Sequence, residues 1–198
     1  ADSRRVNVTS TVALAQRLVA SGARVIFFST GLVFDGSQPF WRETDAVNPQ
    51  CEYGRQKAEA ERGILALGDA AAVARLTKVI APGIPLFRRW REDLAAGHVI
   101  RPFTDYRMSP ITVDLVATAM QSLVKKWLPG VLHLSADCDL DYGEAALELA
   151  MKLDPTLNLM RLVQPTTSRS AGVDLEILPQ FTTLDTTRLR MELGLATP

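Results

Sequence analysis

Residues 25–36 read VIFFSTGLVFDG, and a second segment, YGRQK, follows at residues 53–57. The first segment begins with an apolar run that ends in Ser29 and Thr30, which is typical of a parallel strand covered on both faces. In open α/β sheets, ligands bind beyond the carboxyl ends of such strands. We therefore expect a ligand site around the hydroxyl groups of Ser29 and Thr30.

The second segment places Tyr53 and Lys57 four residues apart, so a helix brings both side chains to one face. A phenol with a pKa of about 10 exchanges protons poorly at neutral pH, and a neighbouring ammonium group lowers that pKa. Thr30 or Ser29 can hydrogen-bond the same reacting oxygen from the strand side. We predict an acid-base site made of Thr30, Tyr53 and Lys57. The alternative is a Tyr53–Lys57 contact on a helix surface without any chemistry.

The charge of the chain is balanced. Of its 198 residues, 22 are Lys or Arg and 22 are Asp or Glu, so no basic field favours nucleic acid or an anionic membrane. No apolar run is long enough to span a membrane, and the first residues lack the pattern of a secretory signal. Cys51 and Cys138 form no CxxC motif, which favours reduced thiols. We predict a cytoplasmic protein with no nucleic-acid or membrane partner.

The order of the site residues resembles that of a known family. The strand ending in Ser29-Thr30 is followed by Val33-Phe34-Asp35-Gly36, Glu43, Pro49, Tyr53-Gly54, Lys57 and Glu61. This combination resembles the extended short-chain dehydrogenase/reductase family, and within it the dTDP-4-dehydrorhamnose reductase-like branch, which acts on nucleotide-linked sugars. The resemblance implies an α/β fold, with a doubly wound parallel sheet of Rossmann type and a small C-terminal substrate lobe.

The same resemblance divides the chain into two parts. Residues 1–83 correspond to the C-terminal part of a dinucleotide-binding domain, and residues 84–198 mainly to the substrate lobe, with 112–135 returning to the sheet. The glycine-rich turn that holds the cofactor pyrophosphate in such folds is absent from the sequence. The resemblance implies a Rossmann part that is N-terminally incomplete, so the choice between NAD and NADP stays open.

The resemblance also implies roles for individual residues. Tyr53 exchanges a proton with the sugar while hydride moves to or from a nicotinamide ring, and Lys57 holds the nicotinamide ribose. Thr30 orients the reacting oxygen of the substrate. Ser29 and Pro82 border the cofactor.

Asn7 has two expected roles, which can coexist. The apolar spacing predicts a helix over residues 8–20, and Asn7 then stands at its N-cap. In the resembled family an asparagine at this place supports a proton relay near the lysine. The chain departs from its branch at Gly31 and Leu32, where Asp-Tyr is usual, and this removes a carboxylate and a phenol from the inherited substrate contacts.

Arg107 is the predicted substrate-binding residue of the lobe. Residues 107–114, RMSPITVD, resemble the family's Arg-x-x-x-x-x-Val-x-Asp segment, in which the arginine meets the substrate diphosphate. A planar guanidinium group matches phosphate oxygens well. The alternatives are an exposed arginine or a surface ion pair between Arg107 and Asp105.

The remaining elements follow from hydrophobic periodicity. We expect strands at 24–29, 71–79 and 131–135, and helices at 49–67, 86–94, 112–127 and 141–153. The family resemblance implies a closing helix at 189–193. The helix at 112–127 is predicted to bury Val113, Val116, Met120, Leu123, Val124 and Trp127. His133 is predicted to be packed and hydrogen-bonded, and no metal-ligand cluster is visible.

These inferences predict an NAD(P)-dependent oxidoreductase or epimerase that acts on a nucleotide-linked sugar, with reduction and epimerisation both open. The family implies a possible homodimer through the helices at 8–20 and 49–67. The alternative is a non-catalytic member that binds a nucleotide or regulates a partner subunit. A further alternative is a segment that is poorly stable and inactive by itself.

Overall fold

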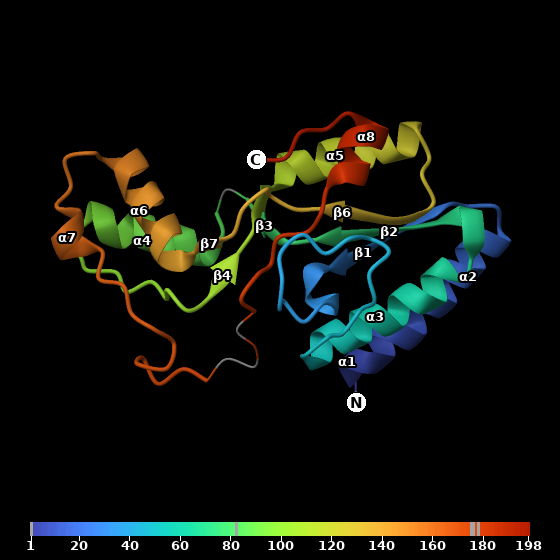
Figure 1. Ribbon diagram of the computed structural model, residues 1–198, viewed down its shortest axis with the longest axis horizontal. Helices are drawn as coiled ribbons and strands as arrows, with labels where there is room; N and C mark the ends of the chain where they lie inside the picture. Colours follow the sequence, from blue (N-terminus) through green and yellow to red (C-terminus); the bar gives the residue numbers. More distant parts are fainter. Residues whose placement is uncertain (1, 82, 175–176, 178) are drawn as a thin grey trace.

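A three-stranded parallel sheet forms the centre of the larger part of the protein (Figure 1). The computed structural model describes residues 2–81, 83–174, 177 and 179–198. Strands β1 (Val25–Thr30), β2 (Ala71–Leu76) and β6 (Gly130–Leu134) lie in the order β1-β2-β6. The register places Thr30 opposite Leu76 and Leu76 opposite Leu134, so the carboxyl ends of the three strands meet at one edge.

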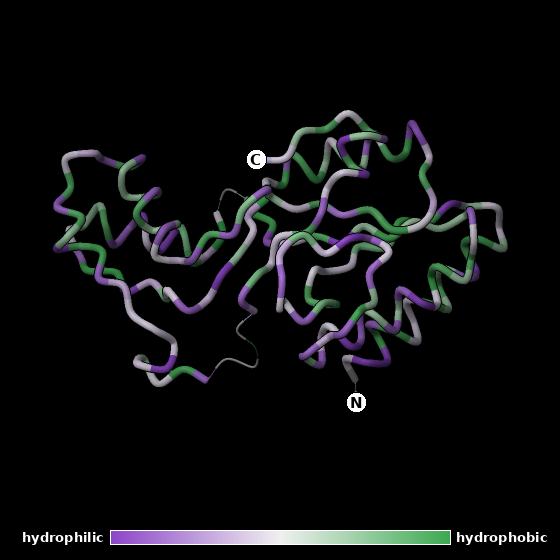
Figure 2. The backbone as a smooth tube through the Cα atoms, viewed as in Figure 1, coloured by the Kyte–Doolittle hydropathy of each residue, from purple (hydrophilic) through white to green (hydrophobic). Residues whose placement is uncertain are grey.

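Helices cover both faces of this sheet (Figure 1). On one side lie α1 (Asp2–Arg4), a π-helical segment (Arg5–Ser10), α2 (Thr11–Ala20) and α3 (Glu52–Leu65). On the other lie α5 (Val113–Lys125) and α8 (Thr187–Leu193). Figure 2 shows hydrophobic and hydrophilic residues alternating along these helices, as expected where one helix face is buried. The predicted α/β class with a doubly wound parallel sheet is confirmed.

The helix predicted at 8–20 begins earlier than expected. Helical backbone runs from Asp2 to Ala20, with residues 5–10 in the wider π form. Asn7 lies inside the π-helical segment, so its predicted N-cap position is wrong. Periodicity missed the extra turns because the first residues, ADSRR, carry no apolar stripe.

Strand β1 is less covered than predicted. Its parallel pairing with β2 is confirmed, but the side chain of Phe28 is 46% exposed. Among the described residues β1 has a strand partner on one side alone, which makes it an edge strand. The prediction of complete cover on both faces is therefore wrong at Phe28.

The strand predicted at 71–79 is two strands. After β2, Thr77 donates its backbone N–H to the oxygen of Leu134, and β3 (Lys78–Ile80) then leaves the central sheet. Strand β3 pairs in parallel with β5 (Pro110–Thr112). The helix predicted at 49–67 is also shorter, because the thiol of Cys51 caps α3 by accepting from the N–H of Gly54.

The smaller lobe is built from the middle and later part of the chain (Figure 1). It contains α4 (Pro85–Ala95), α6 (Tyr142–Leu153), α7 (Leu159–Leu162), and the antiparallel pair β4 (Arg107–Met108) and β7 (Leu140–Asp141). Trp90, Leu94, Ile100, Met108 and Tyr142 are among the buried residues of its core. A capping box between Asp141 and Glu144 begins α6, where the sequence placed a helix start.

The buried face of α5 differs from the predicted stripe. Ala119 and Leu123 are buried, whereas the side chains of Val113 and Val124 are 40% and 64% exposed. Val124 follows Leu123 by one residue, a rotation of about 100° that turns it away from the core. Trp127 lies beyond the helix and donates its indole N–H to the oxygen of Asp69.

The end of the chain returns to the sheet. Leu189 of α8 is fully buried in one hydrophobic cluster with Leu132 and Leu134 of β6. Both α5 and α8 therefore pack on the same side of β6. The domain boundary between residues 83 and 84 stays a prediction.

Candidate active-site pocket

A pocket of about 390 Å³ lies between the carboxyl edge of the sheet and the smaller lobe. Its floor comes from the ends of β1 and β2, the position at which open parallel sheets bind ligands. The described lining residues are Thr30, Gly31, Leu32, Phe34, Gly36, Trp41, Tyr53, Leu76, Thr77, Lys78, Tyr106, Arg107, Met108, Tyr142, Pro179, Phe181, Thr182 and Leu184. Three predicted site residues, Thr30, Tyr53 and Arg107, thus face one pocket.

Thr30 is the last residue of β1, and its hydroxyl oxygen already accepts one hydrogen bond. The Oγ1 atom accepts from the backbone N–H of Leu32 at 3.2 Å, which caps the short 3-10 turn Gly31–Val33. Its own proton is left for an acceptor in the pocket. A Cβ atom on Gly31 would lie 3.6 Å from Leu184 Cδ1, an ordinary contact distance, so a side chain would fit where this chain has none.

Tyr53 projects from the first turn of α3 and is 46% exposed. The Cys51 cap fixes the start of this helix, and Gly54 lets it approach the pocket loop closely. Burial raises the pKa of the Tyr53 phenol, with a smaller contribution from Cys51. The sequence predicted the opposite direction, and that prediction is wrong in this structure.

Lys57 lies one helical turn after Tyr53, as predicted. Its ammonium group lies 5.8 Å from the centroid of the Tyr53 ring and donates to the backbone oxygen of Phe28 at 2.8 Å. Burial lowers the pKa of Lys57, and the charge of Glu61 opposes that shift. The ammonium group faces the tyrosine ring and a strand carbonyl beside the pocket, and burial is the main cause of the pKa shifts of both side chains.

Ser29 faces away from the pocket. Successive residues of a strand point to opposite faces, so Thr30 alone of the hydroxyl pair lines the pocket. The Ser29 hydroxyl is buried, and its oxygen has no hydrogen-bond partner in the described part of the chain.

The remaining predicted cofactor residues lie elsewhere. Asn7 donates from its amide nitrogen to the side-chain oxygen of Gln56 at 2.9 Å, so it braces α3 immediately before Lys57. Pro82 lies outside the described residues. Asn7 is not among the described residues that line the pocket.

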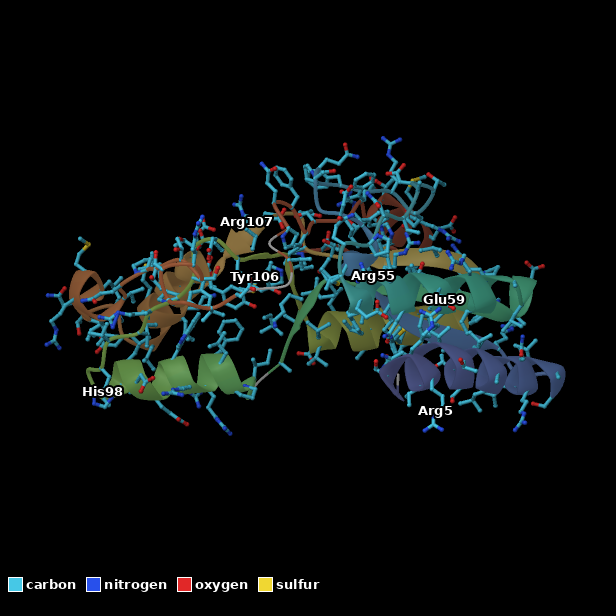
Figure 3. The ribbon with its side chains drawn as sticks, turned by 90° about the horizontal axis from the view of Figure 1, so that it is seen from below. Arg5, Arg55, Glu59, His98, Tyr106 and Arg107 are labelled. Carbon is cyan, nitrogen blue, oxygen red and sulfur yellow. The ribbon has the colours of Figure 1, made fainter. Side chains whose placement is uncertain are left out.

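Arg107 enters the pocket from β4. Figure 3 shows Arg107 and Tyr106 between the smaller lobe and the sheet part. Asp105 accepts hydrogen bonds from the backbone N–H and hydroxyl of Ser168 at 2.9 and 2.7 Å, so the surface pair between Arg107 and Asp105 is not formed. Within the described chain, the guanidinium group of Arg107 makes no hydrogen bond or ion pair, which leaves its donors available to a ligand.

Sequence reasoning missed several pocket residues. Thr77 and Lys78 follow the end of β2, and Tyr106 and Tyr142 come from the lobe with ring centroids 5.4 Å apart. The first pair was detectable, because residues just after a buried strand line the ligand edge of an α/β sheet. The two tyrosines meet only through the tertiary pairing of β4 with β7.

A buried polar network supports the pocket from behind. The guanidinium group of Arg75 donates to both carboxylate oxygens of Glu61, the shorter bond being 2.8 Å, and lies 3.2 Å from His133 Nε2. It also stacks over Phe34 of the pocket wall at 5.0 Å from the ring centroid. The prediction that His133 is packed and hydrogen-bonded is confirmed. Over the described residues, no group of three His, Cys, Asp or Glu side chains is arranged to hold a metal ion.

Comparisons with known proteins agree with this geometry. The family described as RmlD substrate binding domain matches residues 1–198. A probable low-salt glycan biosynthesis reductase, Agl14, from Haloferax volcanii is 31% identical over 183 residues, covering 87% of this chain and 59% of that protein. Methionine adenosyltransferase 2 subunit beta from Danio rerio is 31% identical over 205 residues, covering 96% of this chain and 60% of that protein.

A solved structure has the same fold. The dTDP-4-dehydrorhamnose reductase of Bacillus anthracis in complex with NADP superimposes with a TM-score of 0.86 at 20% identity, over 100% of this chain and 70% of that one. The chain spans 59% and 60% of the two curated relatives. The resemblance to the extended short-chain dehydrogenase/reductase family is confirmed: this chain belongs to the RmlD substrate binding domain family, on its dTDP-4-dehydrorhamnose reductase-like branch.

Proposed function

We propose that the protein is an NAD(P)-dependent oxidoreductase or epimerase that acts on a nucleotide-linked sugar. The observation that carries this proposal is that Thr30, Tyr53 and Arg107, which are far apart in sequence, line one pocket at the ligand edge of the sheet. A hydroxyl, a phenol and a guanidinium group suit a reacting oxygen at one end and a diphosphate at the other. Membership of the family supports the same substrate class.

In the proposed reaction Tyr53 handles the proton. Because burial raises its pKa, the phenol is neutral at pH 7 and acts as a proton donor. On reduction of a keto sugar, a new C–H bond forms, the C=O π electrons move to oxygen, and this oxygen takes the proton of Tyr53. Solvent then reprotonates the tyrosinate. Thr30 donates its hydroxyl proton to the same oxygen and orients it, and the ammonium charge of Lys57 favours the transient tyrosinate.

The residues behind the pocket fit a nicotinamide cofactor. When bound, the nicotinamide ring supplies or accepts the hydride. The ammonium group of Lys57 donates one hydrogen bond to the backbone oxygen of Phe28, so its other N–H groups can also hold ribose hydroxyls. The unpaired hydroxyl of Ser29 gives a further polar contact. We assign Asn7 to bracing this region through Gln56. By the family resemblance, Pro82 borders the nicotinamide end of the cofactor.

Two further parts of the proposal concern the whole protein. Arg107 holds the substrate diphosphate from the lobe side. The protein forms a homodimer through the helices at 8–20 and 49–67, and it works in the cytoplasm in glycan or polysaccharide synthesis. Reduction and epimerisation use the same groups, and the pose of the sugar decides between them.

The proposal is tested by turnover of a panel of nucleotide-linked sugars and keto sugars with NADH and NADPH. Tyr53→Phe removes the phenolic hydroxyl group that donates the proton and should lower kcat by about 10²- to 10⁴-fold. Lys125→Met, an exposed lysine on α5, is the matched control for surface changes and should retain full turnover. Unaltered turnover of every sugar by Tyr53→Phe would rule the mechanism out.

The second candidate is a non-catalytic subunit that binds a nucleotide or regulates a partner enzyme. The observation favouring it is that one relative is named as the beta subunit of methionine adenosyltransferase 2. Gly31 and Leu32, in place of the usual Asp-Tyr, point the same way. Calorimetry with NAD(P)H and nucleotide sugars separates the two candidates, because a regulatory subunit binds cofactor tightly yet transfers no hydride.

A further inference from the structure

The charged side chains among the described lining residues of the pocket are all cations. Its described lining residues include two cations, Lys78 and Arg107, and no carboxylate, although the whole chain carries 22 basic and 22 acidic residues. Some cations elsewhere are paired with a carboxylate, as in the ion pair of Lys126 with Glu192 at 3.0 Å. The side chains of Lys78 and Arg107 make no hydrogen bond or ion pair with the described part of the chain. The pocket therefore favours an anionic ligand.

Lys78 follows the end of β2, which lies beside the end of β1 that carries Thr30. It is the first residue of β3, two residues after Leu76, whose Cα partner in the sheet is Thr30. Its backbone N–H donates to the oxygen of Ser109 at 3.2 Å, which holds this part of the chain between the two sheets. A Cβ atom on Gly31 would lie 3.7 Å from Thr77 Cγ2, so the residue just before Lys78 touches the end of β1.

Arg107 lies in a different pair of strands from Lys78. It belongs to β4 of the lobe, where its Cα pairs with that of Asp141. Lys78 is paired with Pro110, three residues along the chain from Arg107. An extended chain rises by about 3.3 Å per residue, so at most about 10 Å of backbone separates Arg107 from Pro110. Different strand pairs therefore hold the two cations.

We propose that Lys78 binds a carboxylate on the sugar ring, so that the substrate is a nucleotide-linked acidic sugar such as a uronate. This inference rests on the proposed function, in which Thr30 and Tyr53 mark the sugar end and Arg107 takes the diphosphate. An ammonium group is a compact charge with three donors on a flexible stem, which lets it follow a carboxylate on the ring. A neutral sugar would leave this cation without a partner.

Isothermal titration calorimetry of the protein with matched ligands tests the inference. The probes are UDP-glucose and UDP-glucuronic acid, together with the corresponding dTDP pair. The wild-type protein should bind the uronate at least about tenfold more tightly than the neutral sugar. Lys78→Met should weaken uronate binding roughly 10- to 100-fold and leave the neutral sugar within about threefold, because the lost contact is a charge-assisted one.

Two variants control this experiment. Lys78→Arg keeps the charge and should retain most of the preference for the uronate. Lys152→Met removes an exposed lysine at the end of α6, outside the described pocket lining, and should change neither affinity. Thermal melting shows that each variant is folded before its affinities are compared.

Four results would overturn the inference. Equal binding of uronate and neutral sugar by the wild-type protein excludes a carboxylate site. Equal weakening of both ligands in Lys78→Met assigns Lys78 to the diphosphate instead, and unchanged affinities make it a solvated surface residue. If no nucleotide sugar binds the wild-type protein at all, the proposed function itself is wrong, and the inference is wrong with it.

Discussion

The imidazole of His133 is fully buried between two polar partners. Its Nε2 atom lies 3.2 Å from the Arg75 guanidinium group, and Nδ1 lies 3.2 Å from the backbone oxygen of Asp185. Burial, with the charge of Arg75, lowers the pKa of His133 to about 3. The ring is therefore neutral throughout the physiological range and acts as a fixed structural group of β6.

This shift predicts a pH dependence of stability. The pKa of His133 in the folded protein lies below its unfolded value of about 6.5, so its contribution is present above pH 6.5 and is lost as the pH falls towards 3. Between pH 7.5 and 4.5, the free energy of unfolding of the wild-type protein should fall by about 2–3 kcal/mol more than that of His133→Gln. Urea denaturation at both pH values measures this difference. An equal fall in the free energy of unfolding of both proteins would contradict the buried, neutral environment assigned to His133.

At the scale of elements, α3 and the pocket loop approach each other at Gly54. A Cβ atom there would lie 2.2 Å from the backbone oxygen of Leu32 and 3.0 Å from Pro49 Cβ. Only a glycine permits this distance, and the approach sets the position of Tyr53 relative to Thr30. The backbone oxygen is not a flexible group, so the contact cannot be relieved by a change of rotamer.

Gly54→Ala should therefore separate α3 from the loop. Overpacking of this kind costs about 1–3 kcal/mol, although alanine is the better helix former. Chemical denaturation should show the loss, and turnover should fall with it. Arg62→Ala, at an exposed position of the same helix, is the matched control and should change stability by less than about 0.5 kcal/mol. A Gly54→Ala protein as stable as the wild type would show that the close approach does not exist.

Sequence reasoning succeeded where local patterns decide the structure. The apolar run before Thr30, the spacing of Tyr53 and Lys57, and the helix expected from Asp141 all predicted what the structure shows. Sequence reasoning failed where tertiary contacts decide the structure. The pKa of Tyr53 depends on burial by other elements, and the break after β2 depends on pairing of β3 with β5.

The same limit applies to the site. Residue types and order located Thr30, Tyr53 and Arg107, but nothing local to the sequence places Tyr106 or Tyr142 in their company. These two residues reach the pocket through pairing of short strands that are distant in sequence. Ser29 was grouped with Thr30 by adjacency, whereas strand alternation sends it to the other face.

At the scale of the whole molecule, the π-helical segment Arg5–Ser10 and α2 present apolar residues to solvent. Val6, Leu14 and Leu18 have exposed fractions of 58%, 59% and 41%. They follow helical spacing on the side away from the sheet, next to α3. This surface fits the homodimer that we propose through the helices at 8–20 and 49–67.

The proposed dimer predicts that Leu14→Glu shifts the protein towards the monomer. A charge at the centre of an apolar interface must be desolvated, so the dissociation constant should rise by at least about tenfold. Sedimentation velocity over a concentration series measures it. Met191→Glu, at an apolar residue of α8 that is 80% exposed, controls for the added charge. A wild-type protein that stays monomeric at every concentration would contradict the dimer.

The central claim is that this pocket transfers hydride to a nucleotide-linked sugar with Tyr53 as the proton donor. Its most direct test is mass spectrometry of the sugar product formed from a nucleotide-linked keto sugar and NAD(P)H deuterated at the transferring position. We predict deuterium in the sugar with the wild-type protein and with Lys125→Met, and a rate lower by about 10²- to 10⁴-fold with Tyr53→Phe. Deuterium transfer at the wild-type rate by Tyr53→Phe, or no transfer by the wild-type protein, would contradict the claim.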